Sequence, residues 1–202
     1  LHWLTGFNGS AGTAAVLADE AAIFVDGRYT LQVRDQVDGR FYAYENVPET
    51  SPAEWLGEHV PEGARIGFDP WLHGKAWAER AGKALAGRGA TLVPVASNPI
   101  DAIWADRPQP SLAPAEVHDL AYAGVSSEEK RSTVAQWLGE KGLDAAVIAA
   151  LDSIAWLLNI RGTDVERTPV TLSFVLAHAD GTADLFIAPE KVTPELRAHL
   201  GN

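Results

Sequence analysis

Cysteine and methionine are both absent from the 202 residues of this chain. Without cysteine there is no disulfide framework and no thiolate metal ligand, which fits a reducing, cytoplasmic compartment. No apolar run approaches the roughly 20 residues that cross a bilayer, and no basic segment followed by an apolar core opens the chain, so we expect a soluble protein with no membrane partner. Because the chain starts at Leu1, we expect trimmed termini.

Positive charge is also scarce, since 16 Lys and Arg stand against 27 Asp and Glu, for a formal net charge of -11. No basic cluster exceeds the pair Lys130 and Arg131, whereas a nucleic-acid binder needs concentrated positive charge to displace counterions from phosphates. Nucleic acid is therefore not an expected partner. The apolar fraction of 47 % and the charged fraction of 21 % are those of a globular protein.

The first half of the chain alternates between strand and helix signals. Residues 13–25 hold two short apolar runs separated by three residues, which predicts a β-hairpin. Asp26 is placed to cap a following helix, in which Tyr29, Val33 and Val37 form one buried stripe.

Further elements follow up to residue 95, and their alternation is typical of an α/β sandwich. They are a strand at residues 41–44, a helix at 52–59, a buried strand at 65–68, a helix at 74–86 and a strand at 91–95.

Four prolines between residues 98 and 114 mark a linker, because proline continues neither a helix nor a central strand. We therefore predict two domains of ordinary size, at residues 1–104 and 105–202. A long ordered loop inside a single domain is the alternative.

The second half begins again with a helix. Ser126 followed by Glu129 predicts a capping box for a helix that runs to about residue 141 and ends at Gly142. A small apolar strand is expected at residues 145–150.

A helix capped by Asp152 or Ser153 comes next, with Trp156 expected to fill core, and a polar loop follows at residues 161–168. Apolar and polar residues then alternate on both sides of an Asp-Gly turn at 180–181, which predicts a second hairpin. The apolar members of its first strand are Val170, Leu172, Phe174 and Leu176.

No cluster of metal ligands is visible in the sequence. The histidines share no short-range ligand pattern such as H-E-x-x-H, and each is expected to be a surface or helix-end residue; they are His2, His59, His73, His118, His178 and His199. Ligands of di-metal sites can come from distant strands, so spacing alone does not decide the matter. We predict no catalytic residue and no metal ligand in this chain.

Glycines at positions 6, 9 and 12 surround Ser10, but neither a phosphate-binding loop nor a nucleophile elbow fits. The former needs Gly-Lys-Ser/Thr opening a helix, and the latter needs glycine where Asn8 stands. We expect these glycines to let the backbone turn tightly between packed elements.

The segment Asp26-Gly27-Arg28-Tyr29 joins a strand end to a helix start. Its Arg28 guanidinium favours an anionic or carbonyl oxygen, or else pairs with Asp26. For Arg161, an ion pair with Asp164, one with Glu166 and a contact to another domain all remain open.

Four segments together resemble the amino-terminal region of Xaa-Pro aminopeptidases of the aminopeptidase P type, peptidase family M24. They are residues 3–13 (WLTGFNGSAGT), 25–29 (VDGRY), 152–162 (DSIAWLLNIRG) and 168–170 (TPV), and the similarity extends from about residue 1 to residue 191.

This resemblance implies two creatinase N-terminal-like, ribonuclease H-like α/β sandwich domains with mixed sheets, the first of them incomplete at its front. It further implies that a pita-bread catalytic domain with two divalent metal ions, manganese in the family, belongs to the full-length enzyme and is missing here. Of the family's substrate contacts, one carries over to this sequence, and it is Arg28.

The implied function is that of the non-catalytic part of a cytoplasmic, homodimeric metallopeptidase that removes a residue preceding proline from short peptides. This part would position the substrate and support dimerisation, and it is expected to be inactive alone. The alternatives are a free-standing interaction module with the same fold, or part of a creatinase-like amidinohydrolase.

Overall fold

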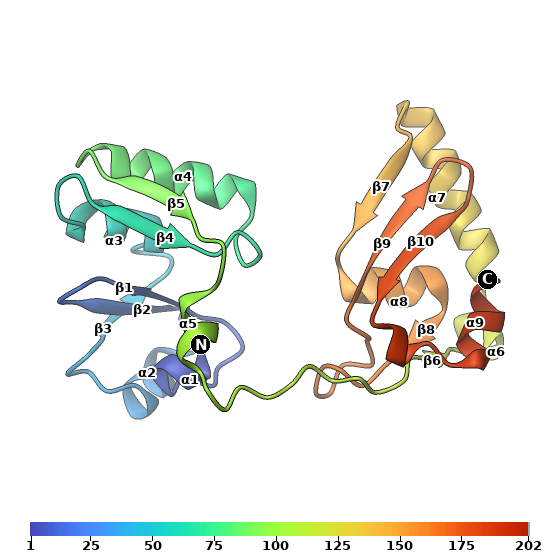
Figure 1. Cartoon of the computed structure of the whole chain (residues 1–202), viewed down its shortest axis with the longest axis horizontal. Helices are drawn as coiled ribbons and strands as arrows, with labels where there is room; N and C mark the ends of the chain where they lie inside the picture. The colour runs from blue at the N-terminus through green and yellow to red at the C-terminus, as the bar shows by residue number, and fades with distance from the viewer. Residues whose placement is uncertain (202) are drawn as a thin grey trace. The chain divides into compact units, whose positions relative to one another are not determined.

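The computed structural model describes residues 1–201, which form two compact units joined by an extended segment (Figure 1). The first unit is Leu1–Arg107, and the second begins at Pro108. Both units combine helices with small sheets, so the predicted α/β class is confirmed. Within residues 1–201, no helix combines the length and the apolar character required to span a membrane.

The first unit is built around the strand β2. Its elements are α1 (His2–Thr5), β1 (Thr13–Val16), β2 (Ala21–Val25), α2 (Thr30–Gln36), β3 (Ala43–Asn46), α3 (Pro52–His59), β4 (Arg65–Phe68), α4 (Lys75–Ala86), β5 (Thr91–Pro94) and α5 (Pro99–Ile103). β2 pairs antiparallel with β1 and parallel with β3, and β4 pairs parallel with β5. The predicted hairpin at residues 13–25 is therefore present.

β2 is almost entirely apolar because both of its faces are covered. Ala22 and Phe24 pack with residues of α3 and α4, whereas Ile23 and Val25 pack with Phe7 and α2. Successive side chains of a strand point to opposite faces, so one strand supplies two cores. The segment before β1 and the turn after β2 therefore lie against a well-packed core.

Three expectations for the first unit need correction. The strand β3 begins two residues later than predicted, and Phe41 is 67 % exposed. β4 is half-exposed rather than buried. Asp26 does not cap α2: Tyr29 occupies the N-cap position, and no side chain caps that helix. Asp26 instead turns toward Arg28, two residues along.

The second unit packs helices on one face of a three-stranded antiparallel sheet. Its elements are β6 (Glu116–Val117), α6 (Leu120–Ala123), α7 (Ser127–Lys141), β7 (Ala145–Ile148), α8 (Leu151–Leu158), β8 (Ile160–Arg161), β9 (Ser173–His178), β10 (Ala183–Ile187), the 3₁₀ turn η1 (Pro189–Lys191) and α9 (Pro194–Leu200). The sheet has the order β10-β9-β7, and β6 pairs with β8. The predicted second hairpin is thus formed by β9 and β10.

The core side of β9 is formed by residues other than the alternating apolar ones named in the sequence. Val175 and Ala177 enter the core with Ile154 and Leu157 of α8, while Phe174 is 50 % exposed on the other face. The strand carries apolar residues on both faces, so its alternation did not reveal which face meets the helices.

The capping box of α7 is confirmed: the Ser126 hydroxyl accepts a hydrogen bond from the Glu129 backbone, and Glu129 bonds back to Ser126. Gly142 ends this helix in the left-handed conformation, with φ of 65°. α8, in contrast, has Ala150 at its N-cap and no side-chain cap, so the capping predicted for it is wrong. Trp156 is also not a core residue, because it is 52 % exposed.

Candidate functional site

The candidate site lies in the first unit, where the glycine-rich segment 6–12 packs against the turn between β2 and α2. Phe7 is its central residue, only 1 % exposed and packed with Ile23 and Val33. The Tyr29 ring meets Phe7 edge-on, with centroids 5.6 Å apart. The edge-to-face arrangement suits the charge distribution of two aromatic rings.

A side chain larger than hydrogen does not fit at Gly9 or Gly12, because the Phe7 ring fills the space beside them. A Cβ at Gly9 would lie 2.3 Å from Phe7 Cζ, and one at Gly12 would lie 3.1 Å from Phe7 Cε1. Gly6 has φ of 80°, and a Cβ there would lie 2.9 Å from the Gln36 carbonyl oxygen. The segment 6–12 therefore turns tightly around the Phe7 ring, as expected for a segment rich in glycine.

Polar side chains connect the segment 6–12 to α2 through hydrogen bonds. The Asn8 side-chain oxygen accepts hydrogen bonds from Gln32 and Gln36, at 2.8 and 2.9 Å, and the Asn8 backbone N–H donates to Gln36 Oε1. The hydroxyl groups of Ser10 and Tyr29 lie 2.6 Å apart, within hydrogen-bond distance. Two segments about 20 residues apart in the chain are thereby held together.

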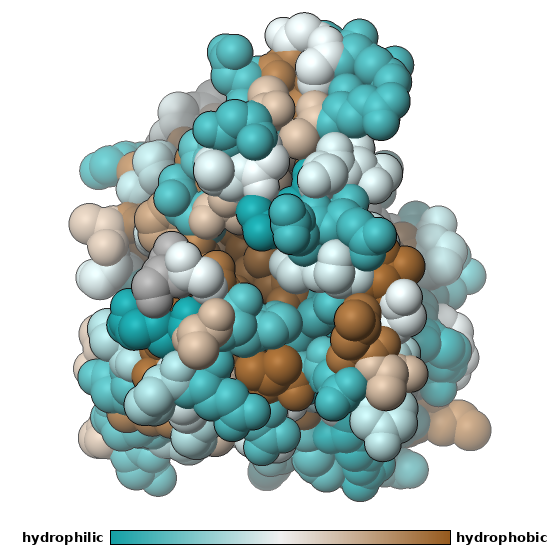
Figure 2. All heavy atoms as spheres, turned by 90° about the vertical axis from the view of Figure 1, so that its right-hand side faces the viewer, coloured by the Kyte–Doolittle hydropathy of each residue, from teal (hydrophilic) through white to brown (hydrophobic). Residues whose placement is uncertain are grey.

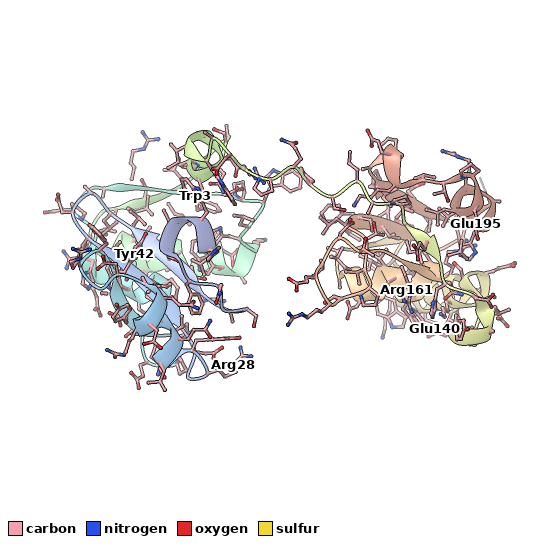
Figure 3. All side chains as sticks on the ribbon, turned by 90° about the horizontal axis from the view of Figure 1, so that it is seen from below. Trp3, Arg28, Tyr42, Glu140, Arg161 and Glu195 are labelled. Carbon is pink, nitrogen blue, oxygen red and sulfur yellow. The ribbon has the colours of Figure 1, made fainter. Side chains whose placement is uncertain are left out.

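Arg28 stands at the exposed edge of this arrangement, in the turn that precedes α2 (Figure 3). Its Nε and Nη2 donate to the two carboxylate oxygens of Asp26, at 2.9 and 2.7 Å, and its backbone N–H donates to the same carboxylate. Its guanidinium also lies over the Tyr29 ring, 5.1 Å from the centroid. The pairing with Asp26 that the sequence left open is thus formed, while 66 % of the Arg28 side chain stays exposed.

These contacts shift the acidities of the two neighbours of Arg28. Hydrogen bonds from the Arg28 side chain and backbone lower the pKa of Asp26, since they stabilise the carboxylate. The hydrogen bond with Ser10 lowers the pKa of Tyr29. Asp26 is therefore ionised at neutral pH, and the Asp26–Arg28 pair carries no net charge.

A second Asp-Gly-Arg turn occurs twelve residues further on, at Asp38-Gly39-Arg40. Arg40 pairs with Asp38 through the same backbone and side-chain donors, and it lies over the Phe41 ring, 5.6 Å from the centroid. The pairing is therefore a local property of this tripeptide. What distinguishes Arg28 is its surroundings.

The second unit has a buried polar centre where α7 meets the end of α8. Lys130 is 4 % exposed, and its Nζ donates to Asn159 Oδ1 at 2.6 Å and to the Trp156 carbonyl at 3.0 Å. Burial lowers the pKa of Lys130, and the nearby Arg161 adds to the effect. Asn159 ends α8 in the left-handed conformation, so Lys130 stabilises the carbonyl end of that helix.

Arg161 forms neither of the ion pairs considered for it. Its Nη1 donates to the carbonyl oxygens of Ala155 and Ile160. Asp164 pairs instead with Lys191, with both side chains buried. Glu166 lies close to Arg167 at the exposed tip of the same loop.

Asp164 anchors the long connection between β8 and β9. Burial alone would raise its pKa, but hydrogen bonds from Lys191, the Leu172 backbone and Thr171 outweigh it and lower the pKa to about 2. The carboxylate therefore holds together three segments of the second unit.

A cavity of about 790 Å³ lies in the second unit between α6, the start of α7, β10 and α9. The side that carries α7 and α9 faces the viewer in Figure 2, where apolar residues are visible at the bottom of a hollow. The lining mixes apolar residues with polar ones of both signs, including Asp119, Arg131 and His199. The His199 Nε2 donates to the Leu158 carbonyl oxygen, 2.8 Å away.

No group of three or more His, Cys, Asp or Glu side chains within residues 1–201 is placed to hold a metal ion. Two of the histidines pair with single carboxylates: His59 with Glu20 and His178 with Asp184, both at 2.9 Å.

The sequence singled out Arg28 and the glycines, but not the residues that support them. Ser10 and Phe7 gave no signal of their own, because their contacts with Tyr29 join segments about 20 residues apart. The position of Phe7 between Gly6 and Gly9 was the sequence signal that could have indicated its role in the site.

Both halves of the chain match family models described as the creatinase/prolidase N-terminal domain. One model matches residues 1–103 and the other residues 106–202. Two curated relatives are similar over 99 % of this chain. A probable Xaa-Pro aminopeptidase P of Aspergillus niger is 40 % identical, and the aminopeptidase P2 of Arabidopsis thaliana is 37 % identical.

The fold is similar to that of an X-prolyl aminopeptidase from Caenorhabditis elegans, described as a cytosolic enzyme with a di-nuclear active site. The TM-score is 0.92 at 32 % identity, over 98 % of this chain and 32 % of that one. This chain also covers 33 % of the Aspergillus niger relative and 29 % of the Arabidopsis thaliana relative. It therefore spans about a third of the length of the proteins that it resembles.

Proposed function

This chain belongs to the creatinase/prolidase N-terminal domain family, and we propose that it is the substrate-positioning, non-catalytic region of a metal-dependent Xaa-Pro aminopeptidase. The observation that carries the proposal is similarity over nearly the whole chain, at 32 to 40 % identity, to three proteins described as aminopeptidases of this type. In the full-length enzyme, the residue released would be the one that precedes proline.

The metal centre of that enzyme would lie in the two thirds of its length that this chain does not cover. The proposal is supported by the di-nuclear active site of the Caenorhabditis elegans relative and by the lack of a ligand cluster within residues 1–201. Two divalent ions, manganese by resemblance to the family, would activate the water that attacks the peptide bond. Residues of this chain would act on the substrate rather than on the metals.

Arg28 is the residue of this chain that would contact the substrate. It is exposed, it has a guanidinium edge free of partners within residues 1–201, and its supporting turn is fixed by Phe7 and Ser10. A cytoplasmic homodimer, in which the first unit reaches the active site of its own or the neighbouring subunit, would present Arg28 to short peptides that contain proline.

Kinetics of the full-length enzyme test this role, with Arg28→Ala compared with Arg40→Ala. Arg40 is the matched control because it stands in a second turn with the same tripeptide, Asp38-Gly39-Arg40, and is also exposed. Loss of a hydrogen bond from a charged group costs about 1.5 to 3 kcal/mol, so Arg28→Ala should lower kcat/KM for an Arg-Pro-Pro peptide by about 10- to 150-fold. Arg40→Ala should leave it unchanged.

Metal analysis and the same cleavage assay on the 202-residue chain complete the test. The 202-residue chain should retain no divalent ion and cleave no peptide, whereas the full-length enzyme should bind divalent ions and cleave the peptide. Tight metal binding with turnover by the 202-residue chain would contradict the proposal. A full-length gene product without a metal-binding catalytic domain would favour a free-standing interaction module instead.

A further inference from the structure

Both units contain the same succession of elements around an antiparallel hairpin. In the first unit the short helix α1 comes before the hairpin of β1 and β2, and α2 comes after it. In the second unit α8 comes before the hairpin of β9 and β10, and α9 comes after it. The first unit therefore serves as an internal reference for how such a hairpin is covered.

One face of each hairpin is covered in the same way. Ile23 of β2 lies in one cluster with Phe7, which follows α1, and with Val33 of α2. Val175 of β9 lies in one cluster with Ile154 of α8 and Leu196 of α9. The helix before the hairpin and the helix after it thus serve the same face in both units.

The opposite faces differ between the two units. In the first unit, Phe24 of β2 is buried in a cluster with Trp55 of α3 and Leu85 of α4, two helices that come later in the chain than α2. In the second unit, Phe174 of β9 and Phe186 of β10 are cross-strand partners, yet they are 50 % and 59 % exposed. Within residues 1–201, no helix covers them as α3 and α4 cover Phe24.

This uncovered surface extends over all three strands of the sheet. Val147 of β7 pairs with Leu176 of β9, and Phe174 pairs with Phe186, so the four side chains point to the same side. We call these four residues the open face. An antiparallel sheet that faces water normally carries polar residues on that side. Contiguous exposed apolar residues instead mark a surface that contacts another part of a protein.

The open face favours an apolar occupant. None of its four residues is charged, and the neighbouring His178 and Asp184 bond to each other at 2.9 Å. A hollow of about 520 Å³ lined by Leu172, Phe174 and Phe186, among others, has room for large apolar side chains. In the first unit, the equivalent cover presents side chains of this kind from α3 and α4.

We propose that the open face is covered, in the full-length polypeptide, by two apolar helices that follow α9 as α3 and α4 follow α2. The relatives have the length for this, since the chain covers only 33 % of the Aspergillus niger protein. The outer edge of β10, which has no partner among the described strands, would receive a parallel strand, as β2 receives β3. This inference rests on the proposed function only in placing the chain within a longer polypeptide.

Thiol labelling tests the cover, because the chain has no cysteine of its own. Phe186→Cys and Val147→Cys are made in the 202-residue chain and in the full-length protein, and the labelled peptides are identified by mass spectrometry. In the full-length protein both introduced thiols should react at least 100-fold more slowly than in the chain, because only an exposed thiol meets the reagent. Phe41→Cys, at a residue of the first unit that is 67 % exposed, is the control and should react equally fast in both.

Two results would overturn the proposal. Equal labelling of both thiols in the chain and in the full-length protein would show that the face stays open. Slow labelling in the chain that becomes faster on dilution would show that a second copy of the chain occupies the face. Val147→Cys removes less apolar volume than Phe186→Cys, so it keeps the test valid if the latter variant does not fold at full length.

Hydrogen exchange tests the predicted strand at the edge of β10. The backbone amides of Ala183–Ile187 should exchange at least tenfold more slowly in the full-length protein than in the chain, because a new neighbour would bond those that point outward. Equal exchange would rule out the added strand.

Peptidase activity of the same full-length preparations is measured separately. Protected thiols in a protein without peptidase activity would refute the proposed function and support the cover. Reactive thiols in an active peptidase would refute the cover and support the proposed function.

Discussion

Phe7 is the residue on which the candidate site is built. Its ring lies against β2 and α2 on one side and is enclosed by Gly9 and Gly12 on the other. The interior of a protein is packed to nearly crystalline density, so such a ring has little room to move. Tyr29, and through it Arg28, depends on this fixed position.

Gly9→Ala should therefore destabilise the first unit. The added Cβ would lie 2.3 Å from Phe7 Cζ, and the resulting displacement in a packed core should cost about 1 to 3 kcal/mol. Urea unfolding followed by tryptophan fluorescence measures the loss of free energy, because five of the seven tryptophans, Trp55 among them, belong to the first unit. Gly27→Ala is the matched control, because a Cβ there meets nothing within 4 Å, and it should be neutral or slightly stabilising.

An equal stability of Gly9→Ala and the wild type would mean that Phe7 can move aside. In that case the ring would not be the fixed support that the structure indicates. The hydrogen bond between Ser10 and Tyr29 alone would then hold Tyr29 in place beside Arg28.

For single residues, the sequence predicted contacts between residues close in the chain better than contacts between residues far apart in the chain. The pair of Asp26 and Arg28 was among the alternatives because two residues in a turn can always reach each other. The contact of Ser10 with Tyr29 and the partners of Arg161 depend on how whole segments pack, which no local pattern encodes. Trp156 was misjudged for the same reason: its exposure follows from the position of α8, not from its own apolar character.

Helices whose ends carry a side-chain signal were predicted with accurate starts, whereas α2 and α8, which have no side-chain cap, were assigned caps that they lack. α3 has the predicted bounds, and α7 starts at the predicted capping box. Strands lack such signals, so β3 was placed two residues early. Both faces of β9 carry apolar residues, so hydrophobicity alone does not select the face that meets the helices.

The connection between β8 and β9 should respond to acid through Asp164. The pKa of this buried carboxylate is lowered to about 2, so its contribution to stability is complete above the usual aspartate pKa of about 4 and is lost as the pH falls from there toward 2. The difference corresponds to about 2 kcal/mol. Hydrogen exchange of the second unit between pH 7 and pH 2 follows this loss.

Asp164→Asn should remove this pH dependence and lower stability at neutral pH by about 3 to 5 kcal/mol, because Lys191 would keep a buried charge without a partner. Asp38→Asn is the control. The pKa of Asp38 is also lowered to about 2, by Arg40, but this aspartate is exposed to solvent, which screens the pair. A similar small effect of both substitutions would show that the burial of Asp164 does not matter.

Each compact unit has its own hydrophobic clusters, two in the first unit and one in the second among the described residues, and the segment between the units is exposed. Phe24, Trp55 and Leu85 belong to the first unit, and Ile154 and Val175 to the second. Residues 105–110 are exposed and include two prolines. The short helix α5 lies just before this segment, a feature that the run of prolines did not predict.

Limited proteolysis should cut the chain first near the predicted boundary after residue 104. Proteinase K should cleave within residues 105–113 and release two fragments of about 100 residues each, because exposed backbone outside helices and strands is cut preferentially. Intact-mass analysis identifies the cut. As a control, chains of residues 1–104 and 105–202 expressed separately should reproduce the amide NMR spectrum of the whole. An initial cut inside either unit would contradict this division.

The neutrality of the Asp26–Arg28 pair has a consequence for how peptides approach the enzyme. Steering of charged ligands from a distance requires an uncompensated field, and at physiological ionic strength even such a field is screened beyond about 8 Å. A dipolar pair has a still shorter reach. The pair itself therefore neither attracts nor repels charged peptides over a distance, in dilute buffer as in concentrated salt, and any long-range steering comes from the other charges of this chain, whose formal net charge is -11.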